Sequence, residues 1–178
     1  VLEELLFATG ERCPQMAVSS ARFANVAFSS GSLLESFVYR IGAPRPLAAP
    51  RDTRRFFISD REAAEICLLA LVNCRTGQLL VPRLSEHDLI DLAATAASFL
   101  QRAGYRPRFV GTLAEADQIL GTGPLPGGDY PVVLTPRDTS GEKPFEIFAS
   151  KDESVVETGL WALVAVEPRR ANAAMLEQ

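Results

Sequence analysis

Hydrophobic residues recur along the chain at two spacings, which predict helices and strands in alternation. A helical spacing of three to four residues covers the ranges 1–9, 33–41, 59–73, 85–103 and 112–120. Apolar runs typical of buried strands lie in 16–28, 78–82, 105–110, 132–134 and 160–166. Since the two kinds of segment alternate, the sequence predicts the α/β class.

Residues that cap or interrupt helices set the expected boundaries. Ser59 with Glu62, Ser85 with Asp88, and Thr112 with Glu115 have the spacing of N-terminal helix caps. Three prolines between 44 and 50 exclude a helix and favour an extended loop. A Gly/Pro loop is expected at 121–131, a short helix or turn at 144–149, and a frayed tail from 168.

Composition narrows the class of protein. The 178 residues are 47% hydrophobic and 22% charged, which suits one domain or one lobe of a larger protein and excludes disorder. The net charge of −4 argues against nucleic acid as the main partner, and no apolar run is long enough to cross a membrane. Three scattered cysteines favour a cytoplasmic location, while a single histidine, His87, argues against a His-based metal site.

One segment of this acidic chain is strongly basic. Between 44 and 61 lie five arginines against two aspartates, at positions 45, 51, 54, 55 and 61. Guanidinium groups match phosphate oxygens bidentately, so the segment is a candidate anion site. The alternative is a solvated loop whose arginines pair with nearby acids.

Nucleotide-binding and nucleophile motifs are absent from the sequence. It contains no Gly-x-Gly-x-x-Gly, no Gly-x-x-Gly-x-x-Gly, no Gly-Lys-Ser/Thr loop and no Gly-x-Ser-x-Gly elbow. The residues alone therefore predict an α/β lobe with an arginine-rich loop and no cofactor site of its own.

Four segments in order resemble the extended short-chain dehydrogenase/reductases that act on nucleotide sugars. They are ARFANVAFSSGS (21–32), DTRRFFIS (52–59), LVPRL with DLA (80–84 and 91–93), and SGEKPFE (140–146). The resemblance is strongest to the UDP-N-acetylglucosamine 4,6-dehydratases of the polysaccharide-biosynthesis group, in their legionaminic-acid branch. Ala24 stands where the family has Gly, and 105–130 resembles an insertion.

The resemblance covers only the C-terminal half of such enzymes. It implies that 1–9 is the end of the helix that carries the catalytic Tyr-x-x-x-Lys, that 1–150 is the substrate-binding half, and that 151–178 is a C-terminal extension. By the same resemblance, NAD(P) and the catalytic residues belong to an N-terminal half. This chain alone is then expected to bind no cofactor, to contain no catalytic residue and to have no dehydratase activity.

Substrate-binding roles follow from the same motifs. Asn25 would approach the diphosphate or sugar of a UDP-sugar, Arg55 would bind the pyrophosphate, and Glu142 would bind the ribose hydroxyls. The uridine slot would be lined by Ser32, Leu33 and Leu47. An epimerase on the same scaffold and a non-catalytic nucleotide-sugar-binding module remain alternatives.

Partners are expected on the same grounds. The predicted partners are the N-terminal half of the enzyme and, in a homo-oligomer, further copies of the chain. The first helix has an apolar face of Leu2, Leu5 and Leu6, which would lose its cover without the other half. We therefore expect the isolated chain to need that half, a dimer partner or a swapped element to stay in solution.

Overall fold

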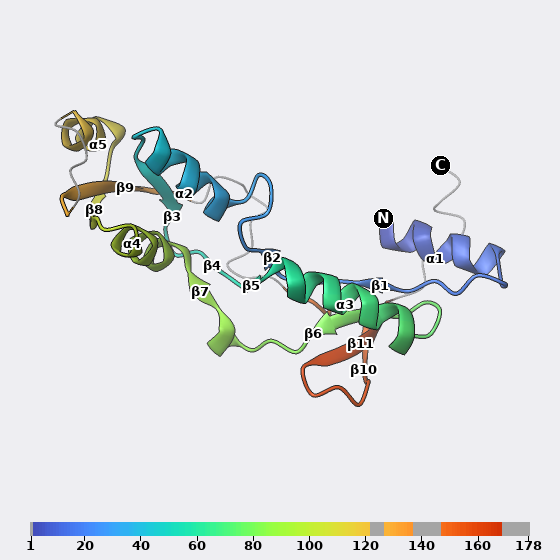
Figure 1. Ribbon diagram of the computed structural model, residues 1–178. Helices are drawn as coiled ribbons and strands as arrows, with labels where there is room; N and C mark the ends of the chain where they lie inside the picture. The colour runs from blue at the N-terminus through green and yellow to red at the C-terminus, as the bar shows by residue number, and fades with distance from the viewer. Residues whose placement is uncertain (1, 122–126, 137–146, 169–178) are drawn as a thin grey trace. The chain divides into compact units, whose positions relative to one another are not determined.

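The structure is a computed structural model that describes residues 2–121, 127–136 and 147–168 (Figure 1). The chain divides into two compact units. Unit 1 comprises Val1–Ala24, Ile58–Ser85 and Ile147–Gln178, and unit 2 comprises Asn25–Phe57 and Glu86–Glu146. Each unit combines helices with its own sheet, which confirms a mixed α/β fold. The expected boundary at 150 lies near the passage from unit 2 to unit 1 between Glu146 and Ile147.

Unit 1 is built on a four-stranded sheet with the order β1-β6-β11-β10. β1 runs parallel to β6, and β11 runs antiparallel to both β6 and β10. Its strands are β1 (Ser20–Ala21), β6 (Leu79–Pro82), β10 (Ser154–Glu157) and β11 (Leu163–Glu167), and its helices are α1 (Leu2–Arg12) and α3 (Asp60–Asn73). β10 and β11 lie in the range that the sequence predicted to be an extension.

Both faces of the unit 1 sheet are covered at β6 and β11, since all four residues of β6 and the first four of β11 are buried. Leu79 and Val81 lie on one face with Val164 and Val166 of β11, and Phe7 of α1 packs against them. α3 contacts β1 and β6, and the alternation of side chains along β6 directs Leu80 to the face opposite Leu79. Unit 1 therefore has three layers: α1, the sheet and α3.

Unit 2 is built on a parallel three-stranded sheet in which β9 lies between β3 and β8. The strands are β3 (Leu47–Pro50), β8 (Arg106–Val110) and β9 (Asp129–Thr135), and the helices are α2 (Leu33–Gly42), α4 (Leu92–Arg102) and α5 (Leu113–Leu120). The segment 105–130 thus contributes β8, α5 and the start of β9. The resemblance to shorter enzymes gave this segment no role, and the structure shows that it extends the unit 2 sheet.

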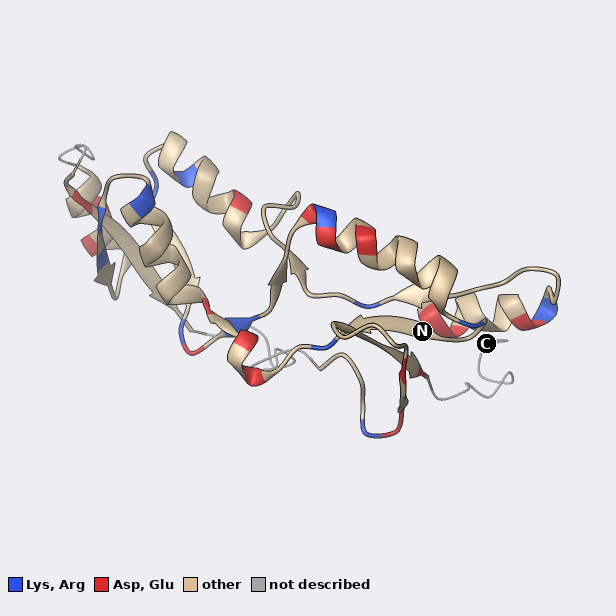
Figure 2. Cartoon of the chain, turned by 60° about the horizontal axis from the view of Figure 1, so that its bottom comes forward, with Lys and Arg blue, Asp and Glu red and all other residues tan. Residues whose placement is uncertain are grey.

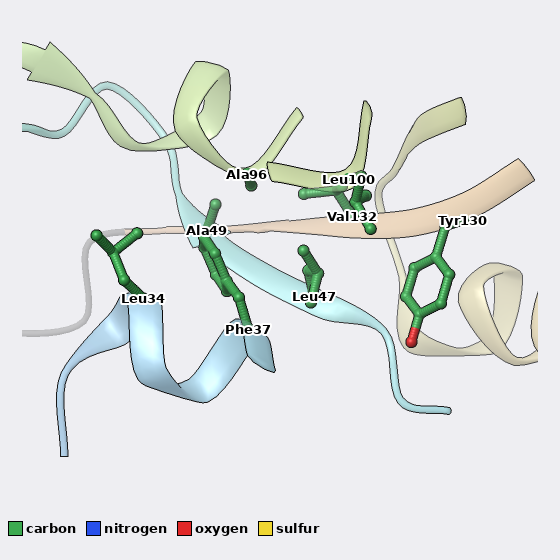
Figure 3. Close-up of a cluster of buried hydrophobic side chains, with 8 residues drawn as sticks. All are labelled: Leu34, Phe37, Leu47, Ala49, Ala96, Leu100, Tyr130 and Val132. Carbon is green, nitrogen blue, oxygen red and sulfur yellow. The ribbon is translucent and has the colours of Figure 1, made fainter. Parts of the chain in front are cut away.

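The core of unit 2 lies between its sheet, α2 and α4 (Figure 3). Phe37 of α2 is fully buried, and its ring centroid lies 5.6 Å from that of Phe99 on α4. The other members of the buried cluster are Leu34, Leu47, Ala49, Ala96, Leu100, Tyr130 and Val132. The hydroxyl of Tyr130 lies 3.0 Å from the carbonyl oxygens of Arg40 and Arg45, so it joins the end of α2 to the segment before β3.

Two expected elements differ in the structure because long-range pairing outweighs the local signal. The helix expected from Ser85 begins only at Leu92, where the Asp91 carboxylate accepts a 2.7 Å hydrogen bond from the Ala94 N–H. Before it lie a short 3-10 turn, η1 (Glu86–Asp88), and β7 (Ile90–Asp91), which pairs with β4 (Arg54–Arg55). The expected proline loop contains β3, whose parallel pairing with β9 ends at Pro50.

Other expected elements are confirmed. Ser59 and Glu62 form a reciprocal capping box at the start of α3, and the Thr112 hydroxyl accepts a hydrogen bond from the Glu115 N–H at the start of α5. The sequence missed β10, whose residues are all exposed. The first half of the turn expected at 144–149, the tail beyond 168 and part of the loop at 121–131 lie outside the described residues, while Phe148 and Ala149 form a bend.

Gly10 of α1 lies against Val18, and this contact leads to a prediction. A Cβ at position 10 would lie 2.9 Å from Cγ2 of Val18 and 3.0 Å from its Cβ, and a β-branched side chain cannot turn away easily. We expect Gly10→Ala to lower the free energy of unfolding by about 1–3 kcal/mol, measured by urea denaturation. An exposed helical glycine would gain about 1 kcal/mol from the same change.

Gly42 of α2 provides the matched control, because a Cβ there would meet nothing within 4 Å. Gly42→Ala is expected to be neutral or slightly stabilising. A neutral Gly10→Ala variant would show that α1 does not approach Val18 this closely.

Candidate functional site

The sequence-predicted binding residues that the structure describes all belong to unit 2. These are Asn25, Ser32, Leu33, Leu47 and Arg55. Glu142 lies outside the described residues, so its predicted role stays a prediction. The site can therefore be built from β2 (Asn25–Val26), β4, the start of α2 and β3.

Asn25 is fixed against the segment that carries Arg55. The backbone N–H of Asn25 and its side-chain Nδ2 both donate to the carbonyl oxygen of Phe56, each at 3.2 Å. Phe56 follows Arg55 directly and lies 31 residues beyond Asn25. This double contact brings two separate sequence motifs to one place and sets the orientation of the Asn25 amide.

Arg55 lies on a short ladder that is anchored on both sides. In the register of β4 with β7, Arg55 is opposite Ile90 and Arg54 is opposite Asp91. The side chain of Arg55 is half-buried, and one of its Nη1 protons is donated to the carbonyl oxygen of Arg54 at 3.0 Å. The planar fork of a guanidinium group matches the oxygens of a phosphate, which makes Arg55 a candidate for anion binding.

The turn before β4 is held by backbone contacts. The Thr53 hydroxyl, which is fully buried, donates to the carbonyl oxygen of Arg51 at 3.0 Å. The Arg51 N–H donates to the carbonyl oxygen of Thr135 at the end of β9, and the Leu92 N–H donates to that of Thr53. These bonds fix Arg51, Arg54 and Arg55 on one short segment of unit 2.

The arginine-rich segment separates into parts with different roles. Arg61 lies on α3 in unit 1 and forms an ion pair with Glu65 at 2.8 Å, as the alternative of paired surface arginines predicts. Arg45 is exposed, and its carbonyl oxygen accepts the Tyr130 hydroxyl. Burial raises the pKa of Tyr130, so this hydroxyl remains a donor at neutral pH. The candidate anion site is thus reduced to Arg51, Arg54 and Arg55.

Two successive turns place Ser32 and Leu33 at the start of α2. Ser29 donates its N–H to the carbonyl oxygen of Val26, and Ser32 donates its N–H to that of Ser29. The Ser32 hydroxyl then caps α2 by accepting the Glu35 N–H at 3.2 Å, and Leu33 packs against the core of unit 2. Both residues are partly exposed, so the structure leaves a ligand contact possible for each.

The N-terminus of α2 already has a carboxylate partner. Glu35 lies in the first turn, and its carboxylate accepts the N–H of Gly31 at 2.6 Å. A negative group at this position compensates the positive end of the helix dipole. The arginines of β4, rather than this helix terminus, are therefore the better candidates for binding a phosphate.

The side chain of Leu47 is part of the core, which limits the role that the resemblance implied for this residue. Its exposed fraction is 0%, and its side chain packs inside the core of unit 2 (Figure 3). The resemblance implied that Leu47 lines a uridine slot; this stays a prediction, and the burial of the side chain leaves the backbone of Leu47 as the part that a ligand could contact. The alternation Leu47–Ala48–Ala49, in which the first and third residues are buried, is the signal for this placement.

An ion-pair cluster in unit 1 was missed by sequence reasoning. Arg22 donates Nε and Nη2 to Glu3 at 2.8 and 2.6 Å, Nη1 and Nη2 to Glu153 at 2.9 and 2.7 Å, and Nη1 to the carbonyl oxygen of Phe148 at 2.8 Å. All five N–H donors are thereby used, and the cluster joins α1, β1 and the segment before β10. The only local signal in the sequence is that Arg22 stands inside an apolar run, where a charged side chain requires a partner of opposite charge.

The Arg22 cluster shifts the pKa values of its members. The two carboxylates raise the pKa of Arg22, with Glu3 the larger contributor. Arg22 lowers the pKa of Glu153 to about 2, helped by the Ser150 N–H, which donates to the same carboxylate at 2.7 Å. The two carboxylates and one cation leave a net charge of −1, but Arg22 is fully engaged, so the cluster supports the structure of unit 1 and offers no cation to a ligand.

Neither a metal site nor a membrane span is found among the described residues. No group of three or more His, Cys, Asp or Glu side chains in 2–121, 127–136 and 147–168 could hold a metal ion. Within the same ranges, no helix combines the length and the apolar character that a membrane span requires.

Comparisons with known proteins give a family and a fold. A family described as "Polysaccharide biosynthesis protein" matches residues 1–167. The solved structure described as "X-ray structure of Pen from Bacillus thuringiensis" superposes with a TM-score of 0.68 at 17% sequence identity. The match covers 96% of this chain and 47% of that one, so the chain spans about half the length of its structural neighbour. No curated protein matches the sequence.

Proposed function

The chain belongs to the polysaccharide biosynthesis protein family, and on this basis we propose that unit 2 binds the nucleotide diphosphate of a UDP-sugar. The parent activity we propose is that of an NAD(P)-dependent UDP-N-acetylhexosamine 4,6-dehydratase in surface polysaccharide or nonulosonic acid biosynthesis. The observation that carries the proposal is the double hydrogen bond from Asn25 to the Phe56 carbonyl, which places Asn25 beside Arg55.

Charge and position support a diphosphate as the ligand. Arg51, Arg54 and Arg55 lie within five residues of a chain whose net charge is −4. A half-buried guanidinium on a fixed ladder loses little conformational freedom when it binds a phosphate bidentately. The Asn25 amide can then contact the sugar or the second phosphate, and the partly exposed residues at the start of α2 can contact the base.

The contribution proposed for this chain is binding and orientation. NAD(P) supplies hydride transfer when it is bound to such an enzyme. The residues present do not fit a dinucleotide, because no strand-to-helix turn in the sequence carries the glycines that bring a backbone against a pyrophosphate. Proposed partners are therefore an N-terminal half that holds the cofactor and, in a homo-oligomer, further copies.

Isothermal titration calorimetry with UDP tests the proposed binding site. We expect Arg55→Ala to weaken UDP binding about 10- to 100-fold, since a lost charge-assisted hydrogen bond costs about 1.5–3 kcal/mol. Uridine, which has no phosphate, should lose little affinity in the same variant. Arg61→Ala is the matched control, because Arg61 comes from the same basic segment but is paired with Glu65 in unit 1.

Two results would refute the binding proposal: wild-type protein that binds no UDP, or an equal loss in the Arg55 and Arg61 variants. The reaction itself is tested on the complete enzyme with UDP-N-acetylglucosamine. The expected product is the 4-keto-6-deoxy sugar, lighter by one water, whereas an epimerase would leave the mass of the substrate unchanged.

A further inference from the structure

Phe28 has an unusual backbone conformation for its residue type. Among the described residues other than glycine, only two have a positive φ, Phe28 at 60° and Asp52 at 51°. Aspartate is several-fold enriched in this left-handed region, whereas a bulky side chain there is a true outlier. Such outliers are concentrated at active sites and ligand clamps. Asp52 directly follows Arg51. Phe28 lies between Asn25 and Ser32, so both outliers belong to segments of the candidate site.

A tight turn holds Phe28 in this conformation. Ser29 donates both its N–H and its hydroxyl to the carbonyl oxygen of Val26, at 3.3 and 2.8 Å. Phe28 is therefore the third residue of the turn, a position at which a positive φ favours glycine. Ala27, the second residue, packs against the core of unit 2, whereas Phe28 is 52% exposed. The turn thus keeps an unfavourable backbone conformation and presents an aromatic ring to solvent.

The same turn keeps the ring close to Asn25. It begins at Val26, the last residue of β2, so Phe28 follows Asn25 by three positions. A turn of four residues brings its ends within about 7 Å of each other, so the ring and the Asn25 amide belong to one small part of unit 2. The Phe56 carbonyl oxygen fixes that amide beside Arg55. A ligand whose phosphate is bound by Arg55 therefore has the Asn25 amide and the Phe28 ring as its neighbours.

The turns that lead into α2 suit an uncharged group with an apolar face. Residues 23–34 contain no Asp, Glu, Lys or Arg, and these turns are tan throughout in Figure 2. The N–H groups of Ser29, Gly31 and Ser32 are already donated to acceptors within the chain. A phosphate needs cations or donors, and a uracil base needs partners for its polar edge. The C–H face of a sugar ring needs an apolar surface, and its hydroxyls need a polar group such as the Asn25 amide.

We propose that the Phe28 ring packs against the C–H face of the sugar of a bound UDP-sugar, while the Asn25 amide contacts the hydroxyls of that sugar. This inference rests on the proposed function of unit 2, and it adds a residue that distinguishes a UDP-sugar from UDP. A ring held in a fixed turn loses little conformational freedom when it binds a ligand. Sugar binding therefore gives the unfavourable conformation of Phe28 a function.

Calorimetric titration of the complete protein with UDP-N-acetylglucosamine and with UDP, without added NAD(P), tests this contact. Phe28→Leu keeps an apolar side chain but removes the aromatic face. We expect it to weaken the binding of UDP-N-acetylglucosamine about 3- to 10-fold and to leave the affinity for UDP unchanged. Phe28→Tyr retains the ring and should bind both ligands as the wild type does. Phe109→Leu is the matched control, because the Phe109 ring on β8 is exposed to a similar 47%, and it should change neither affinity.

Phe28→Gly separates a role in binding from a role in folding. Glycine adopts a positive φ without steric cost, so the melting temperature of this variant should equal or exceed that of the wild type, although it binds UDP-N-acetylglucosamine more weakly. A lower melting temperature with unchanged affinity would overturn the proposal. It is also overturned if Phe28→Leu binds UDP-N-acetylglucosamine as the wild type does, or if its affinity for UDP falls by the same factor, which would place the ring on the nucleotide. In these cases UDP binding by the wild type still supports the proposed function, whereas a wild type that binds no UDP refutes both proposals.

Discussion

Replacing Arg22 with Gln is expected to lower the free energy of unfolding by about 2–3 kcal/mol at neutral pH. The variant leaves the carboxylates of Glu3 and Glu153 without their shared cation and removes the hydrogen bond that Arg22 donates to the Phe148 carbonyl oxygen. Removing one member of a buried pair costs about 3–5 kcal/mol. The expected loss is smaller because the side chains of Arg22 and Glu3 are 25% and 36% exposed.

The loss of stability in Arg22→Gln should also depend on pH. The lowered pKa of Glu153 sets the direction of this dependence. Its pKa of about 2 in the folded protein lies below the ordinary value of 4.5, so the ion pair stabilises the fold above pH 4.5. This stabilisation disappears as the pH falls from about 4.5 towards 2. Urea denaturation should therefore show a large difference in the free energy of unfolding between wild type and Arg22→Gln at pH 7. The difference should be small at pH 2.5.

Arg83→Gln is the control for this experiment. Arg83 pairs with Glu157 on β10, but both side chains are largely exposed, at 46% and 72%. Exposed ion pairs contribute about 0–1 kcal/mol, so the change should be small at both pH values. Equal effects of the two substitutions would contradict the structural role assigned to the Arg22 cluster.

Replacing Phe37 with Ala is expected to have the largest effect on unit 2, about 3–5 kcal/mol. The ring is fully buried in the core between the sheet and α4 (Figure 3). It lies next to Phe99, so its removal would leave a cavity there. Because α2 carries Ser32 and Leu33 at its start, loss of this anchor should also weaken UDP binding. Chemical denaturation and UDP titration measure the two effects.

Phe109→Ala is the matched control, since Phe109 lies on β8 of the same sheet but is 47% exposed. This substitution should lower the free energy of unfolding by less than about 1–2 kcal/mol and leave the affinity for UDP unchanged. A Phe37→Ala variant as stable as Phe109→Ala would mean that α2 is not held by the core shown in Figure 3.

Local signals in the sequence were sufficient where an element depends on its own residues. Ser59 and Glu62 cap α3 through contacts within one turn, so their spacing predicted the helix start correctly. The start of α4 was misplaced because Ile90 pairs with Arg55, which lies 35 positions earlier along the chain. No cap motif can reveal such a pairing, and it converts the expected first turns of a helix into a strand.

The candidate site shows the same limit of local sequence signals, which do not report contacts between distant residues. Motifs selected Asn25 and Arg55, and the structure brings their segments together through Phe56. The same reasoning did not foresee the burial of the Leu47 side chain, because a motif marks a position but does not report which face of a strand a side chain occupies. The Arg22 cluster was missed for a related reason: its members at positions 3, 22 and 153 are far apart in sequence.

The division into two discontinuous units has a consequence for folding during synthesis. The chain passes between the units at 24–25, 57–58, 85–86 and 146–147, so both units remain incomplete until late in translation. β6 ends at Pro82, but its antiparallel neighbour β11 begins only at Leu163. At about 5–20 residues per second, the ribosome needs roughly 4–16 s to supply that neighbour. During this interval the apolar residues of β6 lack one edge partner, and a chaperone that binds extended apolar segments has its best opportunity there.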